Sequence, residues 1–154
     1  MIDLKGGPMA RIVQLEKNVF VASQLTEADF AEIAARGIRS VVNNRPDGEA
    51  DDQLHSAQAE AAARRHGLAF HHAPVTNYDV TEDAPVDTQT RLIADLPGPI
   101  LFYCRTGNRS SILWAQASAA RLGAETVLDR AAAAGFDLAE LREFIDDRAG
   151  ALAA

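Results

Sequence analysis

One stretch of the chain places a nucleophile, two guanidinium groups and a glycine side by side. Its residues are Cys104, Arg105, Thr106, Gly107, Asn108 and Arg109, and Cys104 is the only cysteine of the chain. A neighbouring arginine or a helix N-terminus lowers the pKa of a thiol from about 8.5 to roughly 3.5–7.5, which favours the nucleophilic thiolate. The planar guanidinium of Arg109 suits the oxygens of a phosphate or of a sulfur oxyanion. The stretch therefore predicts attack by Cys104 on an anionic group.

The flanking residues predict the backbone that positions these groups. Residues 99–103 are apolar or aromatic and predict a short buried strand, and residues 110–122 predict a helix. A loop between a strand and a helix N-terminus binds anions through its backbone N–H groups and the helix dipole. Gly107 lets those N–H groups converge, and Ser110 is expected to hydrogen-bond the thiolate or to give it a proton. A purely structural cysteine, the alternative, leaves the two arginines and the glycine unexplained.

Length and composition limit the class of protein. The chain has 154 residues, a net charge of −7 and 47% hydrophobic residues, which predict one α/β domain over residues 10–154. We expect residues 1–9 to be a disordered leader or an expression remnant. The acidic charge argues against nucleic-acid binding, and a single cysteine excludes an internal disulfide framework.

No metal, membrane or cofactor signal appears in the sequence. His71 and His72 are adjacent in a predicted strand, so they point to opposite faces and cannot chelate one ion together. No apolar run is long enough to span a bilayer, and the N-terminus lacks a signal-peptide pattern. We therefore expect a cytoplasmic protein with no metal, no cofactor and no membrane partner.

The order of the predicted elements indicates the fold class. Two strands at 11–15 and 18–22 precede strands at 38–43, 68–75 and 99–103. These alternate with helices at 26–36, 50–66 and 85–96, and helices at 110–122, 125–134 and 138–148 follow. This order predicts an α/β fold with a largely parallel central sheet flanked by helices on both faces.

Two further loops are expected at the edge of the sheet that carries Cys104. Residues 43–49 and 76–83 each follow a strand, and the loops after the carboxyl ends of parallel strands carry ligands. Arg45 and Asp47 are therefore candidate substrate-binding residues, although Pro-Asp-Gly also predicts a simple turn. Both interpretations stay open. Asp79 is the candidate catalytic carboxylate of the second loop.

Three segments together resemble a known family. They are residues 43–49, Pro74-Val75, and 103–110 with Leu113-Trp114-Ala115. They resemble the phosphatase-like domain of beta-lactamase-hydrolase-like proteins, over roughly residues 10–141, and this family is similar to dual-specificity cysteine phosphatases. The resemblance implies a cysteine-phosphatase-like fold with Cys104 as nucleophile, Gly107 as the loop glycine, Arg109 as the phosphoryl-binding arginine and Ser110 as the hydroxyl residue after it.

The sequence departs from ordinary cysteine phosphatases at three places. Tyr103 stands where histidine is usual, and four residues rather than five separate Cys104 from Arg109. The position of the usual general-acid aspartate falls on Asn77, so the acid is Asp79 two residues on, Asp47, or no residue at all, and Asp79 is the candidate of choice. The shorter loop is very similar to the active loop of rhodanese sulfurtransferases, a resemblance that implies a persulfide on Cys104 and no acid.

Three functions remain. The favoured one is a cysteine-dependent hydrolase of phosphate monoesters, the second is a sulfurtransferase, and the third is a non-catalytic module that binds phosphorylated or sulfated ligands. The partner is then a phosphorylated or sulfur-containing small molecule or protein, contacted by Arg105, Thr106, Gly107 and Asn108. A cavity wide enough for phosphate, with a carboxylate close by, favours the first function. Burial of Cys104 together with a raised thiol pKa argues against all catalytic functions.

Overall fold

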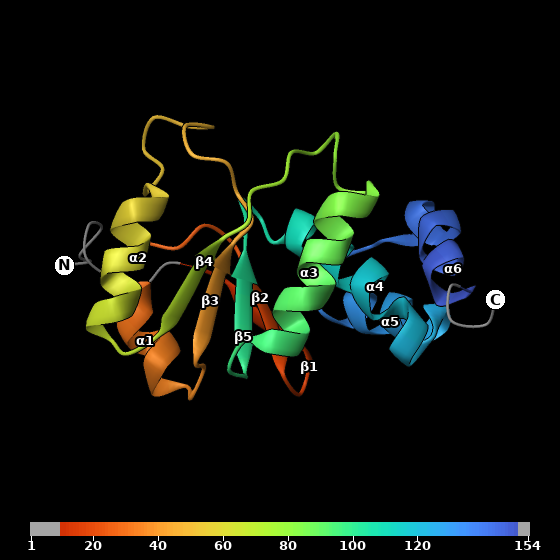
Figure 1. The fold of residues 1–154 in the computed structure, drawn as a ribbon, viewed down its shortest axis with the longest axis horizontal. Helices are drawn as coiled ribbons and strands as arrows, with labels where there is room; N and C mark the ends of the chain where they lie inside the picture. The colour runs from red at the N-terminus through yellow and green to blue at the C-terminus, as the bar shows by residue number, and fades with distance from the viewer. Residues whose placement is uncertain (1–9, 151–154) are drawn as a thin grey trace.

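Five strands form one sheet in the order β1-β2-β5-β3-β4 (Figure 1). The computed structural model describes residues 10–150, so the expected leader at 1–9 lies outside the described residues. The strands are β1 (Ile12–Glu16), β2 (Val19–Ala22), β3 (Ser40–Asn43), β4 (Ala69–His72) and β5 (Ile100–Tyr103). Only β1 and β2 pair antiparallel, and the other three pairings are parallel. The predicted fold class, an α/β fold with a largely parallel sheet, is confirmed.

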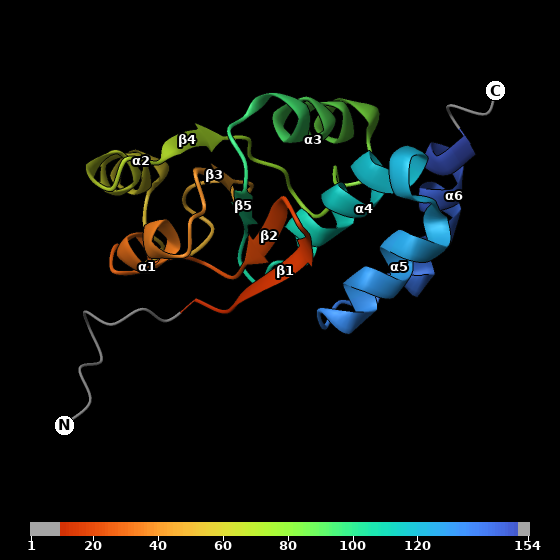
Figure 2. The same cartoon turned by 90° about the horizontal axis from the view of Figure 1, so that it is seen from below.

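Helices cover both faces of this sheet (Figures 1 and 2). They are α1 (Asp29–Ala35), α2 (Ser56–Arg65), α3 (Asp83–Asp95), α4 (Asn108–Leu122), α5 (Ala124–Ala133) and α6 (Arg142–Gly150), with a 3-10 turn at Ala139–Leu141 before the last. The helices α1 and α2 lie on one side, and α3 to α6 lie on the other.

The alternation of side chains along β5 builds both cores. Leu101 and Tyr103 pack into the core under α1 and α2, whereas Ile100 and Phe102 pack into the core under α3 to α6. All four side chains are fully buried. A central parallel strand is buried on both faces. This packing holds β5 in place, and with it the position of Cys104, which follows the strand.

Three helices begin later than their sequences predict. The helix expected from residue 138 begins at Arg142, after the 3-10 turn over Ala139–Leu141. The helix expected from Thr26 begins at Asp29, because the Asp29 carboxylate accepts hydrogen bonds from the N–H and hydroxyl of Thr26 and holds a turn there. The helix expected from residue 50 begins at Ser56, where the Asp47 carboxylate accepts from the Ser56 N–H and hydroxyl at 2.9 and 2.7 Å. Residues 44–55 thus form a long loop at the carboxyl edge of the sheet.

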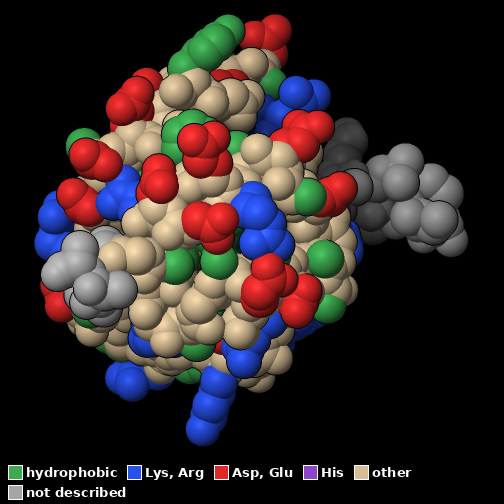
Figure 3. All heavy atoms as spheres, turned by 90° about the vertical axis from the view of Figure 1, so that its right-hand side faces the viewer, with side chains coloured by type: hydrophobic (Ala, Val, Ile, Leu, Met, Phe, Trp, Pro, Cys, Tyr) green, Lys and Arg blue, Asp and Glu red, His purple; other side chains and the backbone are tan. Residues whose placement is uncertain are grey.

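The end of the molecule that carries α5 and α6 has a mixed surface. Acidic and basic side chains are interspersed there, and hydrophobic ones are scattered (Figure 3). Arg148 of α6 pairs with Asp83 of α3 at 2.7 Å, and Arg142 pairs with Glu125 of α5 at 2.7 Å. This face offers no continuous basic surface. Separately, none of the helices within residues 10–150 is both long and apolar enough to cross a membrane.

Candidate active site

Cys104 follows directly after β5, and the chain then turns through Gly107 into α4. Gly107 has a φ of 95°, which side chains rarely adopt, and a Cβ there would lie 3.0 Å from the Phe136 ring. With this backbone, the Gly107 N–H donates to the Cys104 sulfur at 3.1 Å. The structure therefore aims a backbone amide and a helix N-terminus at the thiol, an arrangement that stabilises a thiolate.

Arg109 stands beside this sulfur. The hydrogen bonds that Arg109 donates to Glu49 raise the pKa of Arg109, although burial opposes part of this shift. Arg109 is 5% exposed and Cys104 is 1% exposed. A substrate therefore reaches the sulfur only if the side chains above it move.

Glu49 holds the outer end of the Arg109 guanidinium. Arg109 donates from Nη1 to Glu49 Oε2 at 2.9 Å and from Nη2 to Glu49 Oε1 at 2.8 Å, and Nη1 also donates to the Val75 carbonyl at 3.0 Å. Among the described residues, no oxygen accepts a hydrogen bond from Arg109 Nε. The guanidinium also interacts with the Cys104 side chain, so Arg109 links the Glu49 carboxylate to the thiol.

The same carboxylate also binds Arg45. Arg45 Nε donates to Glu49 Oε1 at 2.8 Å, so one oxygen is shared by two buried arginines. The hydrogen bonds from Arg109, with those from Arg45, lower the pKa of Glu49 to about 2 although partial burial opposes the shift. Glu49 is therefore ionised at neutral pH.

Sequence reasoning missed Glu49, although a signal for it was present. It lies in the same loop as Arg45 and Asp47, four residues after Arg45. Arg45 and Arg109 are predicted at one edge of the sheet, and two guanidinium groups packed together there require a carboxylate nearby, because an unpaired buried charge is costly. In the fold, Glu49 is the acidic residue of the loop after β3 that pairs with Arg45 and Arg109.

Asp47 and Arg45, from the same loop, are placed differently. Both carboxylate oxygens of Asp47 accept from Ser56, and the side chain is exposed. Burial raises the pKa of Asp47, but the hydrogen bonds from Ser56 more than offset this, so the pKa lies below its ordinary value. Asp47 thus caps the N-terminus of α2 and stabilises the turn before it. Arg45 instead lines the two cavities described below.

Ser110 and Asp79 do not contact the sulfur in this structure. The buried Ser110 hydroxyl donates to Asn44 Oδ1 at 2.9 Å. Asp79 is exposed and accepts from the Thr76 hydroxyl at 3.0 Å within its turn. Thr106 and Asn108 are exposed and linked to each other, since the Asn108 N–H donates to the Thr106 hydroxyl at 3.2 Å.

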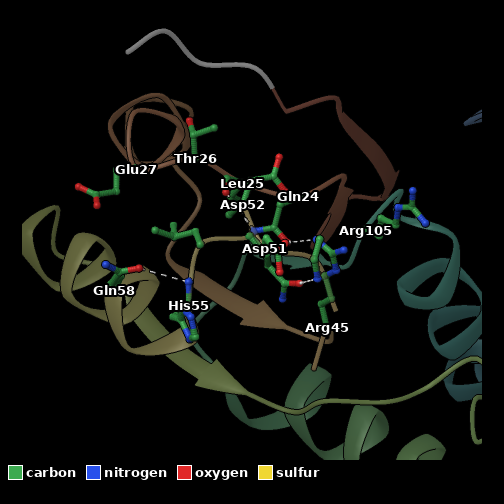
Figure 4. A pocket seen from close by; sticks show the side chains of 13 residues that line it. Gln24, Leu25, Thr26, Glu27, Arg45, Asp51, Asp52, His55, Gln58 and Arg105 are labelled. Atoms are coloured by element: carbon green, nitrogen blue, oxygen red, sulfur yellow. Dashed lines mark hydrogen bonds between the residues drawn. The ribbon is translucent and has the colours of Figure 1, made fainter. Parts of the chain in front are cut away.

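Two cavities adjoin this constellation. The arginine hollow, of about 390 Å³, is lined by Arg45, Glu49, Ala50, Asn77, Arg105 and Arg109. The outer hollow, of about 770 Å³, is lined by residues 24–27, Arg45, residues 50–55, Gln58 and Arg105 (Figure 4). Both volumes lie in the range of roughly 300–1,000 Å³ that is common for ligand sites. The arginine hollow holds three guanidinium groups and one carboxylate, which together suit a phosphoryl group.

Sequence comparison identifies relatives of this chain. Residues 11–121 match the family described as beta-lactamase hydrolase-like protein, phosphatase-like domain. A beta-lactamase hydrolase-like protein of Xylella fastidiosa (strain 9a5c) is 34% identical over 141 residues, which are 90% of this chain and 32% of the relative. One of Agrobacterium fabrum is 28% identical over 144 residues, 92% of this chain and 33% of the relative. The chain thus spans about a third of the length of these relatives.

Solved structures show the same fold. A candidate phosphatase of Neisseria meningitidis is 38% identical, with a TM-score of 0.80 over 89% of this chain and 97% of that chain. Pseudomonas aeruginosa TpbA, solved in complex with phosphotyrosine, is 14% identical with a TM-score of 0.65, and the match covers 99% of each chain.

Proposed function

Because the chain belongs to the phosphatase-like domain family of beta-lactamase hydrolase-like proteins, we propose that it hydrolyses phosphate monoesters through a cysteinyl-phosphate on Cys104. The observation that carries the proposal is the hydrogen bond from the Gly107 N–H to the Cys104 sulfur at the N-terminus of α4, beside Arg109. Binding of phosphotyrosine by TpbA, a protein of the same fold, also supports a phosphorylated ligand. The proposal concerns this domain, not the longer relatives as wholes.

The reaction proceeds in two displacements. The Cys104 thiolate attacks phosphorus, so that an S–P bond forms as the P–O ester bond breaks and its electron pair stays on the leaving oxygen. That oxygen takes a proton from an acid, for which Asp79 is the proposed residue. Water then attacks phosphorus and the S–P bond breaks. This returns the thiolate, the proton goes to the Asp79 carboxylate, and inorganic phosphate leaves.

The remaining residues bind and position the phosphoryl group. Arg109 neutralises its charge, and the N–H groups of residues 105–109 hold its oxygens. Glu49 is a positioning residue, because it fixes the terminal nitrogens of Arg109. Ser110 assists the thiolate once its hydroxyl leaves Asn44. Asp79 reaches a leaving group once its turn releases Thr76.

Sulfur chemistry is the second candidate, favoured by the four-residue spacing between Cys104 and Arg109. The match to a phosphatase-like domain family, and the likeness to a candidate phosphatase of Neisseria meningitidis, support phosphate. The test is hydrolysis of p-nitrophenyl phosphate between pH 5 and 7.5 by the wild-type chain and by Cys104→Ser. We expect turnover that is lost in Cys104→Ser while its circular dichroism is unchanged. Equal rates in the two proteins, with a persulfide on Cys104 after thiosulfate treatment, would establish the sulfurtransferase instead.

A further inference from the structure

The outer hollow adjoins the arginine hollow. Arg45, Ala50 and Arg105 line both cavities. On the proposed function, a phosphoryl group occupies the arginine hollow, and the ester oxygen then carries the rest of the substrate away from Arg109. The larger neighbouring cavity is the space into which that leaving group extends.

Arg45 offers a free donor at the junction. Its side chain is 6% exposed, its Nε donates to Glu49, and its Nη1 donates to Gln24 Oε1 at 3.0 Å (Figure 4). Within residues 10–150, Nη2 has no hydrogen-bond partner, yet it is not among the fully buried unpaired atoms. A nearly buried guanidinium with an unused N–H that reaches a cavity is arranged for an acceptor on a ligand.

The rest of the lining supplies hydrogen-bonding groups of both kinds. Acceptors come from Glu27, Asp51 and Asp52, and groups that both donate and accept come from Gln24, Gln58 and His55. Neither Asp51 nor Asp52 forms an ion pair within the described part of the chain. Leu25 and Leu54 provide the apolar contacts, and the lining contains no Phe, Tyr or Trp. An aromatic leaving group would offer no hydrogen bond to Asp51, Asp52 or Arg45 Nη2 and would displace water from them, which is unfavourable.

We propose that the outer hollow is a leaving-group subsite for a hydroxyl-rich phosphate ester, a sugar phosphate or another polyol phosphate. Hydroxyl groups donate to the carboxylates and accept from Arg45 Nη2 and the amides, so they satisfy every kind of group in the lining. The inference rests on the proposed function only for the placement of the phosphoryl group.

The experiment measures binding rather than turnover. Isothermal titration of the Cys104→Ser protein compares inorganic phosphate, ethyl phosphate, glucose 6-phosphate, phenyl phosphate and 2-aminoethyl phosphate. We expect glucose 6-phosphate to bind about tenfold more tightly than ethyl phosphate, the effect of one or two net hydrogen bonds. Two double variants, Cys104→Ser with Asp52→Ala and Cys104→Ser with Gln58→Ala, should each lose most of the tighter binding of glucose 6-phosphate. Both should bind inorganic phosphate as tightly as Cys104→Ser does. Asp146→Ala on α6, an exposed aspartate outside the lining, is the matched control.

The outcomes separate the two proposals. If glucose 6-phosphate binds no better than ethyl phosphate, or if phenyl or 2-aminoethyl phosphate binds best, the polyol subsite is wrong while the phosphatase proposal stands. An advantage for glucose 6-phosphate that survives both variants also overturns the subsite. If inorganic phosphate does not bind to the folded Cys104→Ser protein, the proposed function fails, and the subsite fails with it.

Discussion

Glu49 holds both terminal nitrogens of Arg109, at 2.9 and 2.8 Å, across 60 residues of sequence. One of its oxygens is shared with Arg45. Two buried guanidinium groups at one edge of the sheet are thereby neutralised in part and fixed in orientation. Arg109 also interacts with the Cys104 side chain, so the carboxylate of Glu49 positions a guanidinium group directly beside the thiol.

Glu49→Gln should lower kcat for p-nitrophenyl phosphate about 100-fold and change KM much less. The amide keeps the shape but loses the charge that orients Arg109, and a misplacement of about 1 Å costs on the order of 10²-fold in rate. Glu49→Asp, which keeps the charge, should recover part of the loss. Steady-state kinetics measure both, with Glu60→Gln as control because Glu60 forms an exposed pair with Arg64 four residues on. A kcat equal to wild type in Glu49→Gln would show that Arg109 needs no such support.

Glu49 should also make stability depend on pH. The contacts with Arg109 and Arg45 lower its pKa from 4.5 to about 2 in the folded chain. The ionised carboxylate therefore contributes stability that is fully present above about pH 4.5 and is lost as the pH falls toward 2. Since the side chain is 30% exposed, we expect solvent screening to limit the contribution at pH 7 to about 1 kcal/mol. Urea unfolding of wild type and Glu49→Gln should show a difference at pH 7 that shrinks by pH 3, and a constant difference would contradict this cause.

Asp79→Asn tests the identity of the acid. Loss of a general acid should slow alkyl phosphates about 100-fold, but aryl phosphates with good leaving groups less than tenfold. The measurement compares kcat for ethyl phosphate and p-nitrophenyl phosphate, with Asp83→Asn as an exposed control near the start of α3. Equal losses on the two substrates would remove Asp79 from the mechanism.

Asp47→Ala should weaken the fold and leave the site intact. The carboxylate caps the first turn of α2 through Ser56, and loss of such a cap costs roughly 0.5–2 kcal/mol. Denaturant unfolding measures the change, and phosphate binding to Cys104→Ser with and without Asp47→Ala should agree within twofold. Phosphate affinity that falls tenfold would instead make Asp47 a ligand of the anion.

The sequence by itself determined what depends on neighbours along the chain. The apolar residues 99–103, the glycine at 107 and the following apolar helix predict a strand, a tight loop and a helix, and the structure has Cys104 directly after β5 and Arg109 in the first turn of α4. The alternation of strands and helices determined the α/β class and the mostly parallel sheet. These features follow from local backbone preferences and from the burial of short apolar runs.

Tertiary structure decided what surrounds that loop. Because β3 pairs directly with β5, the loop after β3 brings Glu49 to Arg109 and Asn44 to Ser110. The helix α2 begins at Ser56 rather than at residue 50 because a side chain from outside the helix caps it there. A local pattern contains no information on such contacts, since they depend on strand order and on the reach of side chains from separate segments. The strand order therefore decided which carboxylate stands beside Arg109.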